Sequence, residues 1–257
     1  MLGEATTAAL DRAAGRRRAA AAAAVLLFLP TSYASAEPPP APAWREFWAG
    51  ADVSGHVWLA YSGATVAPFG GMFSDGLRLR AASGYGGYTY AGPRDGRLQA
   101  FEADTTFGDA LVGYLSRLGP LTAKAFVGIA AIDHAVRPID PDNPVQGFDF
   151  GPKGVAEFWL NMGEGAWSSL DVSWTSAHQT YSARARSGYR LFADFSIGAE
   201  ARVNGNALDK DARGGLFLRY AWDGGEISVS GGVSGRFLED AGDMTDPYAG
   251  MLWLTQY

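Results

Sequence analysis

The stretch from Tyr181 to Val203 alternates apolar and polar residues almost without a lapse, and this period of two limits the possible folds more than any other feature of the chain. Successive side chains of a β-strand point to opposite faces, so one face of this stretch is apolar and the other is charged. The charged face is rich in arginine and also carries acids. Two folds fit this pattern: a soluble sandwich that hides its apolar face, and a membrane barrel whose apolar face contacts lipid while its charged face lines the lumen.

The same alternation recurs in segments from residue 44 to the end of the sequence. The segments are about ten residues or longer, which is the span of a tilted membrane strand, whereas sandwich strands average about five or six. Short turns at 163–165 and 223–225 alternate with longer loops at 135–151, 204–213 and 238–247, and the last residue is the aromatic Tyr257. We therefore predict an all-β, antiparallel up-and-down transmembrane β-barrel formed by residues 44–257.

The number of strands depends on two long segments. Treating 181–203 as one strand gives about ten strands, and splitting it near Asp194 gives eleven. Dividing 44–62 in two as well gives twelve. An odd number cannot place both chain ends on the same side of a membrane, so the pattern predicts a barrel of about 10 to 12 strands with the exact number open.

The first 36 residues have the organisation of a secretory signal peptide. Four arginines between 12 and 18 precede an apolar run at 19–29, and Ala34-Ser35-Ala36 provides a small-residue cleavage site. The apolar run is too short to span a bilayer comfortably, which takes about 20 residues. The Pro-rich segment 37–43 is expected to form an extended tether.

The predicted mature chain is acidic and lacks cysteine. Removal of residues 1–36 leaves 17 basic and 25 acidic residues, a formal charge of −8. Binding to a nucleic-acid backbone requires a basic surface, so nucleic acid is not an expected partner. The absence of cysteine excludes disulfides and thiolate chemistry, and we expect no cofactor.

Several short motifs, taken in order, resemble one protein family. They are Trp48-Ala49-Gly50-Ala51-Asp52, Tyr61-Ser62-Gly63, Ala67-Pro68-Phe69-Gly70, Asp75-Gly76-Leu77-Arg78-Leu79-Arg80, Gly84-Tyr85-Gly86-Gly87-Tyr88, the run Asp140 to Gly147, and Gly188-Tyr189-Arg190. Together they resemble the cellulose biosynthesis protein BcsS family over nearly the whole mature chain. The resemblance implies an outer-membrane β-barrel of a Gram-negative bacterium that is associated with cellulose production. It supplies no catalytic residues, and nothing in the chain resembles the helical repeats that precede the larger glucan exporter of such systems.

The polar positions of the predicted strands give the candidate lumen-lining residues. Their charges alternate in sign between neighbouring strands, and opposite charges on paired strands attract. In a barrel of this size such pairs can cross-link the interior, so a plugged, self-neutralised lumen is the favoured interpretation. The candidates are Asp52, His56, Arg78, Arg80, Glu102, Asp104, Lys124, Glu157, Asp171, Arg184, Arg186, Arg190, Glu200 and Arg202.

A polar path for a glucan or a small solute is the alternative interpretation of the same lumen. Trp48, Trp58 and Trp159 are the candidate stacking surfaces for sugar rings. The expected partners are outer-membrane lipid, a cellulose or other glucan chain, and other cellulose-secretion proteins. The predicted role is a non-enzymatic accessory or structural component of cellulose or exopolysaccharide secretion, with a narrow solute pore as the alternative.

Catalysis and metal binding receive little support from the sequence. Only His56, His134 and His178 could supply an imidazole base, and none lies in a recognisable pattern with a serine. The acidic and amide side chains between 140 and 149 are of the type that Ca²⁺ prefers, but such residues also build turns among prolines. We therefore expect neither an enzyme nor a metal site.

Overall fold

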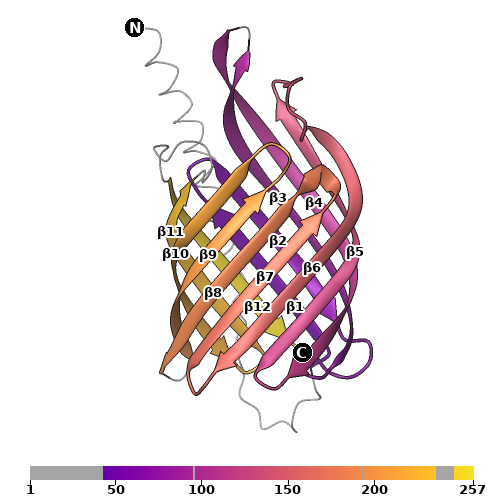
Figure 1. The fold of residues 1–257 in the computed structure, drawn as a ribbon, viewed down its shortest axis with the longest axis vertical. Coiled ribbons are helices and arrows are strands. Elements are labelled where there is room, and N and C mark those ends of the chain that lie inside the picture. Colours follow the sequence, from indigo (N-terminus) through magenta and orange to yellow (C-terminus); the bar gives the residue numbers. More distant parts are fainter. Residues whose placement is uncertain (1–42, 95, 193, 236–245) are drawn as a thin grey trace. The chain divides into compact units, whose positions relative to one another are not determined.

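The computed structural model describes residues 43–94, 96–192, 194–235 and 246–257, so the predicted signal peptide and nearly all of the predicted tether lie outside the described residues. The described residues form a closed antiparallel barrel of twelve strands (Figure 1). The fold class is therefore as predicted. The strands are β1 (Arg45–Val53), β2 (Val57–Val66), β3 (Gly76–Arg94), β4 (Arg97–Leu118), β5 (Leu121–Arg137), β6 (Gly147–Met162), β7 (Ala166–Thr175), β8 (Tyr181–Phe192), β9 (Phe195–Gly205), β10 (Lys210–Trp222), β11 (Gly225–Gly235) and β12 (Asp246–Gln256).

Each strand pairs with the next one along the chain, and β1 pairs with β12 to close the barrel. Both divisions that the sequence left open are present, because β1 ends at Val53 before β2 begins at Val57, and β8 ends at Phe192 before β9 begins at Phe195. The count is therefore twelve. An even count places the start of β1 and the end of β12 at the same end of the barrel, where the amide of Arg45 donates to the carbonyl of Tyr257.

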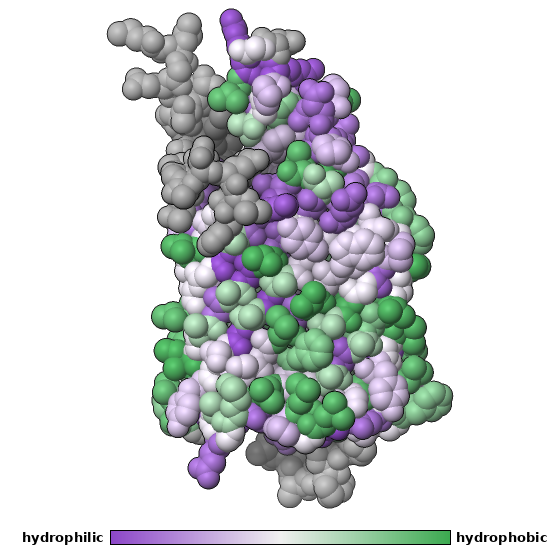
Figure 2. Space-filling model, viewed as in Figure 1, coloured by the Kyte–Doolittle hydropathy of each residue, from purple (hydrophilic) through white to green (hydrophobic). Residues whose placement is uncertain are grey.

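The outer surface of the barrel carries the apolar positions of the strands. Large apolar side chains there are strongly exposed; Val127 on β5 retains 65% of its accessible surface and Leu216 on β10 retains 63%. Figure 2 shows apolar side chains gathered over the lower part of one face and hydrophilic ones toward the upper end. Burial of such a belt requires an apolar environment, and a bilayer provides one.

Aromatic residues gather on the outer surface at the end of the barrel where β1 begins. Phe47 stacks on Tyr257 with ring centroids 5.9 Å apart. A second row runs from Phe192 through Phe195 to Tyr220, with centroid separations of 5.2 and 4.7 Å. Aromatic girdles of this kind mark the interface between hydrocarbon and water in membrane barrels.

Three strands extend well beyond the span of a bilayer. β3, β4 and β5 have 19, 22 and 17 residues, whereas a tilted membrane strand needs about 9 to 11. Figure 1 shows the β3–β4 hairpin rising past the neighbouring turns. The inner face of this projection is an apolar core of Phe101, Ala103 and Val136, against which Tyr88 and Tyr90 pack.

The single described helical segment is the one-turn 3-10 segment η1 (Ala177–Gln179). Among the described residues no helix has both the length and the apolar character to cross a membrane.

Candidate functional site

The register of strand pairing and the burial of the side chains together define which residues point into the barrel. Eleven of the fourteen predicted lumen residues lie on inward-facing positions of their strands. Arg190 is the least enclosed, because it lies near the end of β8 and is exposed. The eleven are Asp52, Arg78, Arg80, Lys124, Glu157, Asp171, Arg184, Arg186, Arg190, Glu200 and Arg202.

The prediction that Glu102 and Asp104 line the lumen is wrong, because both lie on the outer face of β4. Their strand neighbours Phe101 and Ala103 face inward and are almost fully buried. Asp104 instead accepts a hydrogen bond from the exposed Tyr85 hydroxyl and lies 3.4 Å from Arg137. The physical reason is that this part of β4 belongs to the projection, where the outer face is compatible with water and the inner face needs an apolar core.

His56 and Trp58 are also placed differently from the prediction. His56 lies in the β1–β2 turn with 63% of its side chain exposed, so it is at the rim and not in the lumen. Trp58 pairs with Gly87 on the outer face and packs edge-on against Tyr85, with ring centroids 5.4 Å apart. The inward positions of β2 are taken by Leu59 and Tyr61. Trp48 and Trp159 do face inward.

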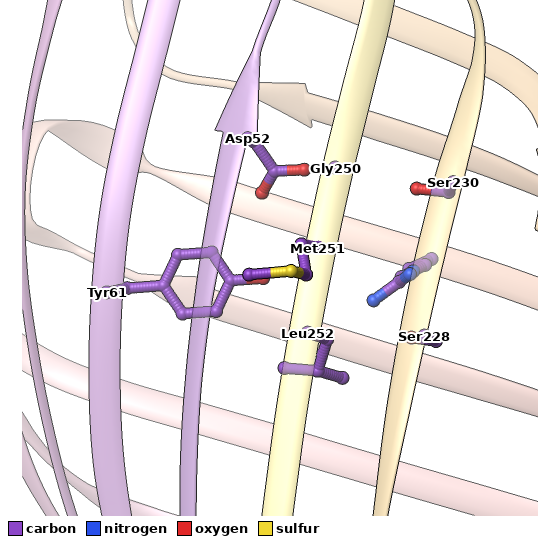
Figure 3. Close-up of a pocket in the computed structure, with 8 residues that line it drawn as sticks. Asp52, Tyr61, Ser228, Ser230, Gly250, Met251 and Leu252 are labelled. Carbon is purple, nitrogen blue, oxygen red and sulfur yellow. The ribbon is translucent and has the colours of Figure 1, made fainter. Parts of the chain in front are cut away.

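Asp52 is the centre of one interior cluster. Arg202 on β9 donates to its carboxylate at 3.1 Å, and Arg213 on β10 lies 4.0 Å from it. Strands β10, β11 and β12 separate β9 from β1, so the Arg202–Asp52 pair crosses the lumen and does not run along the wall. Figure 3 shows Asp52 and Tyr61 on β1 and β2 facing Ser228 and Ser230 of β11. The cavity between these residues is only about 10 Å³, which is about the space of a single water.

Glu200 extends this cluster around the wall. It accepts hydrogen bonds from Arg184 on β8 at 2.7 Å and from the Tyr248 hydroxyl on β12 at 3.0 Å. Arg184 also lines the small cavity beside Asp52. Arginine from one side and tyrosine from the other therefore fix this carboxylate, which is less than one-tenth exposed.

Glu157 is the centre of a second cluster on the opposite side of the interior. Its carboxylate pairs with Arg80 on β3 and with Lys124 on β5, the latter at 3.2 Å. Arg80 also lies over the Trp48 ring, 5.0 Å from its centroid. Since β4 and β5 separate β3 from β6, the Arg80–Glu157 pair is a second bridge that spans part of the lumen.

Beside this second cluster lies a cavity of about 100 Å³. Trp159 lines it, and the Trp159 ring stacks on Trp167 with centroids 4.3 Å apart. Arg219 lies over both indoles and is paired with Glu226. The residues around the cavity are Thr122, Lys124, Glu157, Phe158, Trp159, Ser169, Asp171 and Arg186.

Arg78 has a structural role at the end of the barrel where the chain enters. Its guanidinium is fully buried and donates to backbone carbonyls of the β2–β3 loop, including Gly71 at 3.0 Å and Ser74 at 2.5 Å. The same loop buries Met72. Through its two terminal nitrogens Arg78 holds this loop at the mouth, and it forms no ion pair with the acids of the lumen among the described residues.

The prediction missed several interior groups. Lys153 and Asp109 form an ion pair between β6 and β4, and Arg213 pairs with Asp211 within β10. Lys153 lies on β6, which begins at Gly147, inside the loop predicted at 135–151. Asp109 shares its parity with Phe107 and Leu111, and those apolar residues indicated an outward face.

The described histidines do not form a convincing catalytic group. His56 lies 3.4 Å from both Thr89 and Asp246, but it is open to solvent. In the projection, burial and then the neighbouring His178 lower the pKa of His134 to about 4. His134 contacts the Tyr88 hydroxyl at 3.2 Å, and no serine hydroxyl hydrogen-bonds a histidine among the described residues.

The segment 140–146, which precedes β6, is built as a turn. The Asp140 carboxylate accepts hydrogen bonds from Tyr90 and from the amide of Asp142, and the Asn143 side chain caps the amide of Val145. No group of three or more acidic or histidine side chains within the described ranges is arranged to hold a metal ion.

Comparison with known proteins gives a family and a set of related folds. A family model described as cellulose biosynthesis protein BcsS matches residues 47–256. No curated protein matches the sequence. A deltaS2S3 mutant of the monoaromatic hydrocarbon channel TodX is 8% identical with a TM-score of 0.51, over 84% of this chain and 91% of that chain.

Two further solved structures are similar at lower TM-scores. The KdgM porin in complex with disordered oligogalacturonate is 10% identical with a TM-score of 0.49, over 82% of this chain and 99% of that chain. The outer membrane phospholipase A from Escherichia coli is 11% identical with a TM-score of 0.42, over 83% and 93%. At 8% identity the likeness to the TodX mutant concerns the fold alone.

Proposed function

The chain belongs to the cellulose biosynthesis protein BcsS family, and from this premise we propose that it is a non-enzymatic outer-membrane barrel that acts as an accessory or structural component of cellulose secretion. The apolar outer belt and the aromatic girdle support the membrane location. The start of β1 and the end of β12 then lie on the periplasmic side, and the β3–β5 projection lies at the cell surface.

The observation that carries the accessory role is the cross-linked interior. Arg202–Asp52 and Arg80–Glu157 bridge strands that are not neighbours, and Glu200 is held between Arg184 and Tyr248. Such bridges occupy the path that a hydrated solute would follow, because the lumen of a twelve-stranded barrel is narrow. A self-neutralised interior favours a scaffold over the alternative, a narrow pore for small polar solutes.

The first prediction concerns membrane insertion and conductance. Protein from isolated outer membranes is expected to migrate differently on a gel before and after boiling, because a closed barrel resists detergent until it is heated. Reconstituted in planar bilayers, it is expected to give no steady ionic current, whereas the double variant Asp52→Ala with Arg202→Ala is expected to give one. A steady current from the unaltered protein would instead favour the pore, and a soluble periplasmic pool with no mobility shift would exclude the barrel in the outer membrane.

The second prediction concerns the role in the cell. A strain that lacks this chain is expected to deposit less cellulose at its surface while its uptake of small polar solutes is unchanged. Cellulose is measured by dye binding and by glucose released with cellulase, and uptake by radiolabelled solutes. Normal cellulose with impaired uptake would contradict the accessory role.

A further inference from the structure

Three polar atoms on residues that line the cavity of about 100 Å³ beside Trp159 lack partners. Nε and Nη1 of Arg186 and Oγ of Ser169 are buried without a hydrogen bond, and each residue is only 8% exposed. The described part of the chain also gives the Asp171 carboxylate no hydrogen bond or ion pair. Buried polar groups in native proteins are nearly always paired, so these donors and the Asp171 carboxylate form a set that a bound polar ligand can satisfy.

The charges around the cavity favour an uncharged ligand. Lys124 and Arg186 contribute two positive charges, and Glu157 and Asp171 contribute two negative ones. Glu157 is already engaged by Arg80 and Lys124, which leaves a guanidinium, a carboxylate and a hydroxyl for the ligand. Hydroxyl groups both donate and accept, so a polyol can satisfy all three, whereas an anion would meet Asp171 and a cation would meet Arg186.

The cavity also has an aromatic residue in its lining. Trp159 presents a ring to the cavity, and its orientation is fixed by stacking on Trp167 and by a hydrogen bond from its Nε1 to Asn161 at 3.0 Å. A rigid aromatic surface next to a few convergent polar groups is the usual composition of a small-molecule site. The apolar face of a pyranose ring can pack on such an indole while the ring hydroxyls reach the polar groups.

Size and position agree with a single sugar unit. A cavity that admits one water needs about 10 to 15 Å³, so about 100 Å³ holds several waters or roughly one pyranose. Thr122 is the second residue of β5, and Trp159 lies three residues before the end of β6, which places the cavity near the end of the barrel where β1 begins and β12 ends. Under the proposed function this is the periplasmic end.

We propose that this cavity binds one uncharged pyranose unit of a glucan chain, with Trp159 as the stacking surface, Arg186 and Ser169 as donors and Asp171 as the acceptor. The proposal rests on the proposed function, because that function brings a glucan to this protein. The proposal gives different roles to two of the three tryptophans predicted to stack on sugar. Trp159 contacts the sugar, whereas Trp48 packs against Arg80, which forms the ion pair with Glu157.

The test is binding of cellotetraose to the purified, heat-modifiable barrel, measured by tryptophan fluorescence and calorimetry. Asp171→Asn and Trp159→Leu are each expected to weaken binding by about 10-fold or more, since each removes a contact of the bound sugar. Trp174→Leu is the matched control, because Trp174 lies on the outer face of β7 and is 51% exposed. Ser169→Ala, the smallest change, is expected to weaken binding while the boiling shift stays normal.

Absence of cellotetraose binding, or equal binding by the Trp159→Leu and Trp174→Leu variants, would overturn the sugar site. Tighter binding of an oligogalacturonate than of cellotetraose would overturn the uncharged ligand. The deletion strain separates the two proposals. If the strain loses cellulose but the protein binds no sugar, the accessory role stands and the sugar site is wrong. If the protein binds sugar but the strain makes normal cellulose, the sugar site stands and the accessory role is wrong.

Discussion

Replacing Glu157 by glutamine is expected to lower the free energy of unfolding by about 3 kcal/mol, which is the scale for breaking an enclosed ion pair. The carboxylate is the common partner of Arg80 and Lys124, and all three side chains are at least three-quarters enclosed. The substitution preserves volume but leaves two cations without a counter-charge. Most of the loss therefore comes from those cations and not from the missing contact itself.

The measurement is the equilibrium unfolding of the barrel in lipid vesicles, with the boiling shift as a check that each variant has folded. Glu164→Gln is the matched control; Glu164 lies in the exposed β6–β7 turn, where the same change is expected to alter stability by about 0.5 kcal/mol or less. Adding Lys124→Met to Glu157→Gln removes one of the unpaired cations and is expected to recover part of the stability. Equal losses from Glu157→Gln and Glu164→Gln would show that the interior bridge contributes nothing.

The barrel could be predicted from the sequence because the outer surface imposes one rule on every strand that crosses an apolar layer. In 181–203 the inward set Arg184, Arg186, Glu200 and Arg202 follows directly from alternation. The sequence could not decide whether the stretch turns near Asp194, because the alternation runs through this position without a proline or glycine signal.

The prediction was wrong for Glu102, Asp104 and Trp58 for a physical reason. Alternation indicates only that two faces differ; the assignment of the polar face to the lumen assumes lipid outside. The outer end of β4 has no such constraint, because its inner face packs against Tyr88 and Tyr90. On β2, glycine at 63 and tyrosine at 61 occupy the inside and leave Trp58 outside.

The pairs inside the lumen could not be predicted even where the inward residues were right. Alternation identifies neighbours on adjacent strands, such as Lys124 and Glu157. Arg80 and Glu157 are 77 residues apart with two strands between them, and Asp52 and Arg202 are 150 apart. Which side chains meet across a barrel depends on its strand number and stagger, and neither is encoded in the pattern of a single strand.

If the apolar outer surface is embedded in lipid, the cost of a charged substitution on it depends on the depth of the residue in the bilayer. Val127→Arg places a charge on the outer face of β5, where Val127 is 65% exposed, and at the bilayer centre it is expected to destabilise the folded barrel by about 2 to 4 kcal/mol. Ala135→Arg is the matched control on the same strand and the same face, eight residues farther into the projection, where the expected cost is about 0 to 1 kcal/mol. Unfolding in vesicles measures both. Similar costs at the two positions would mean that the apolar belt is not lipid-embedded, and the membrane location would then fail together with the interpretation of the lumen.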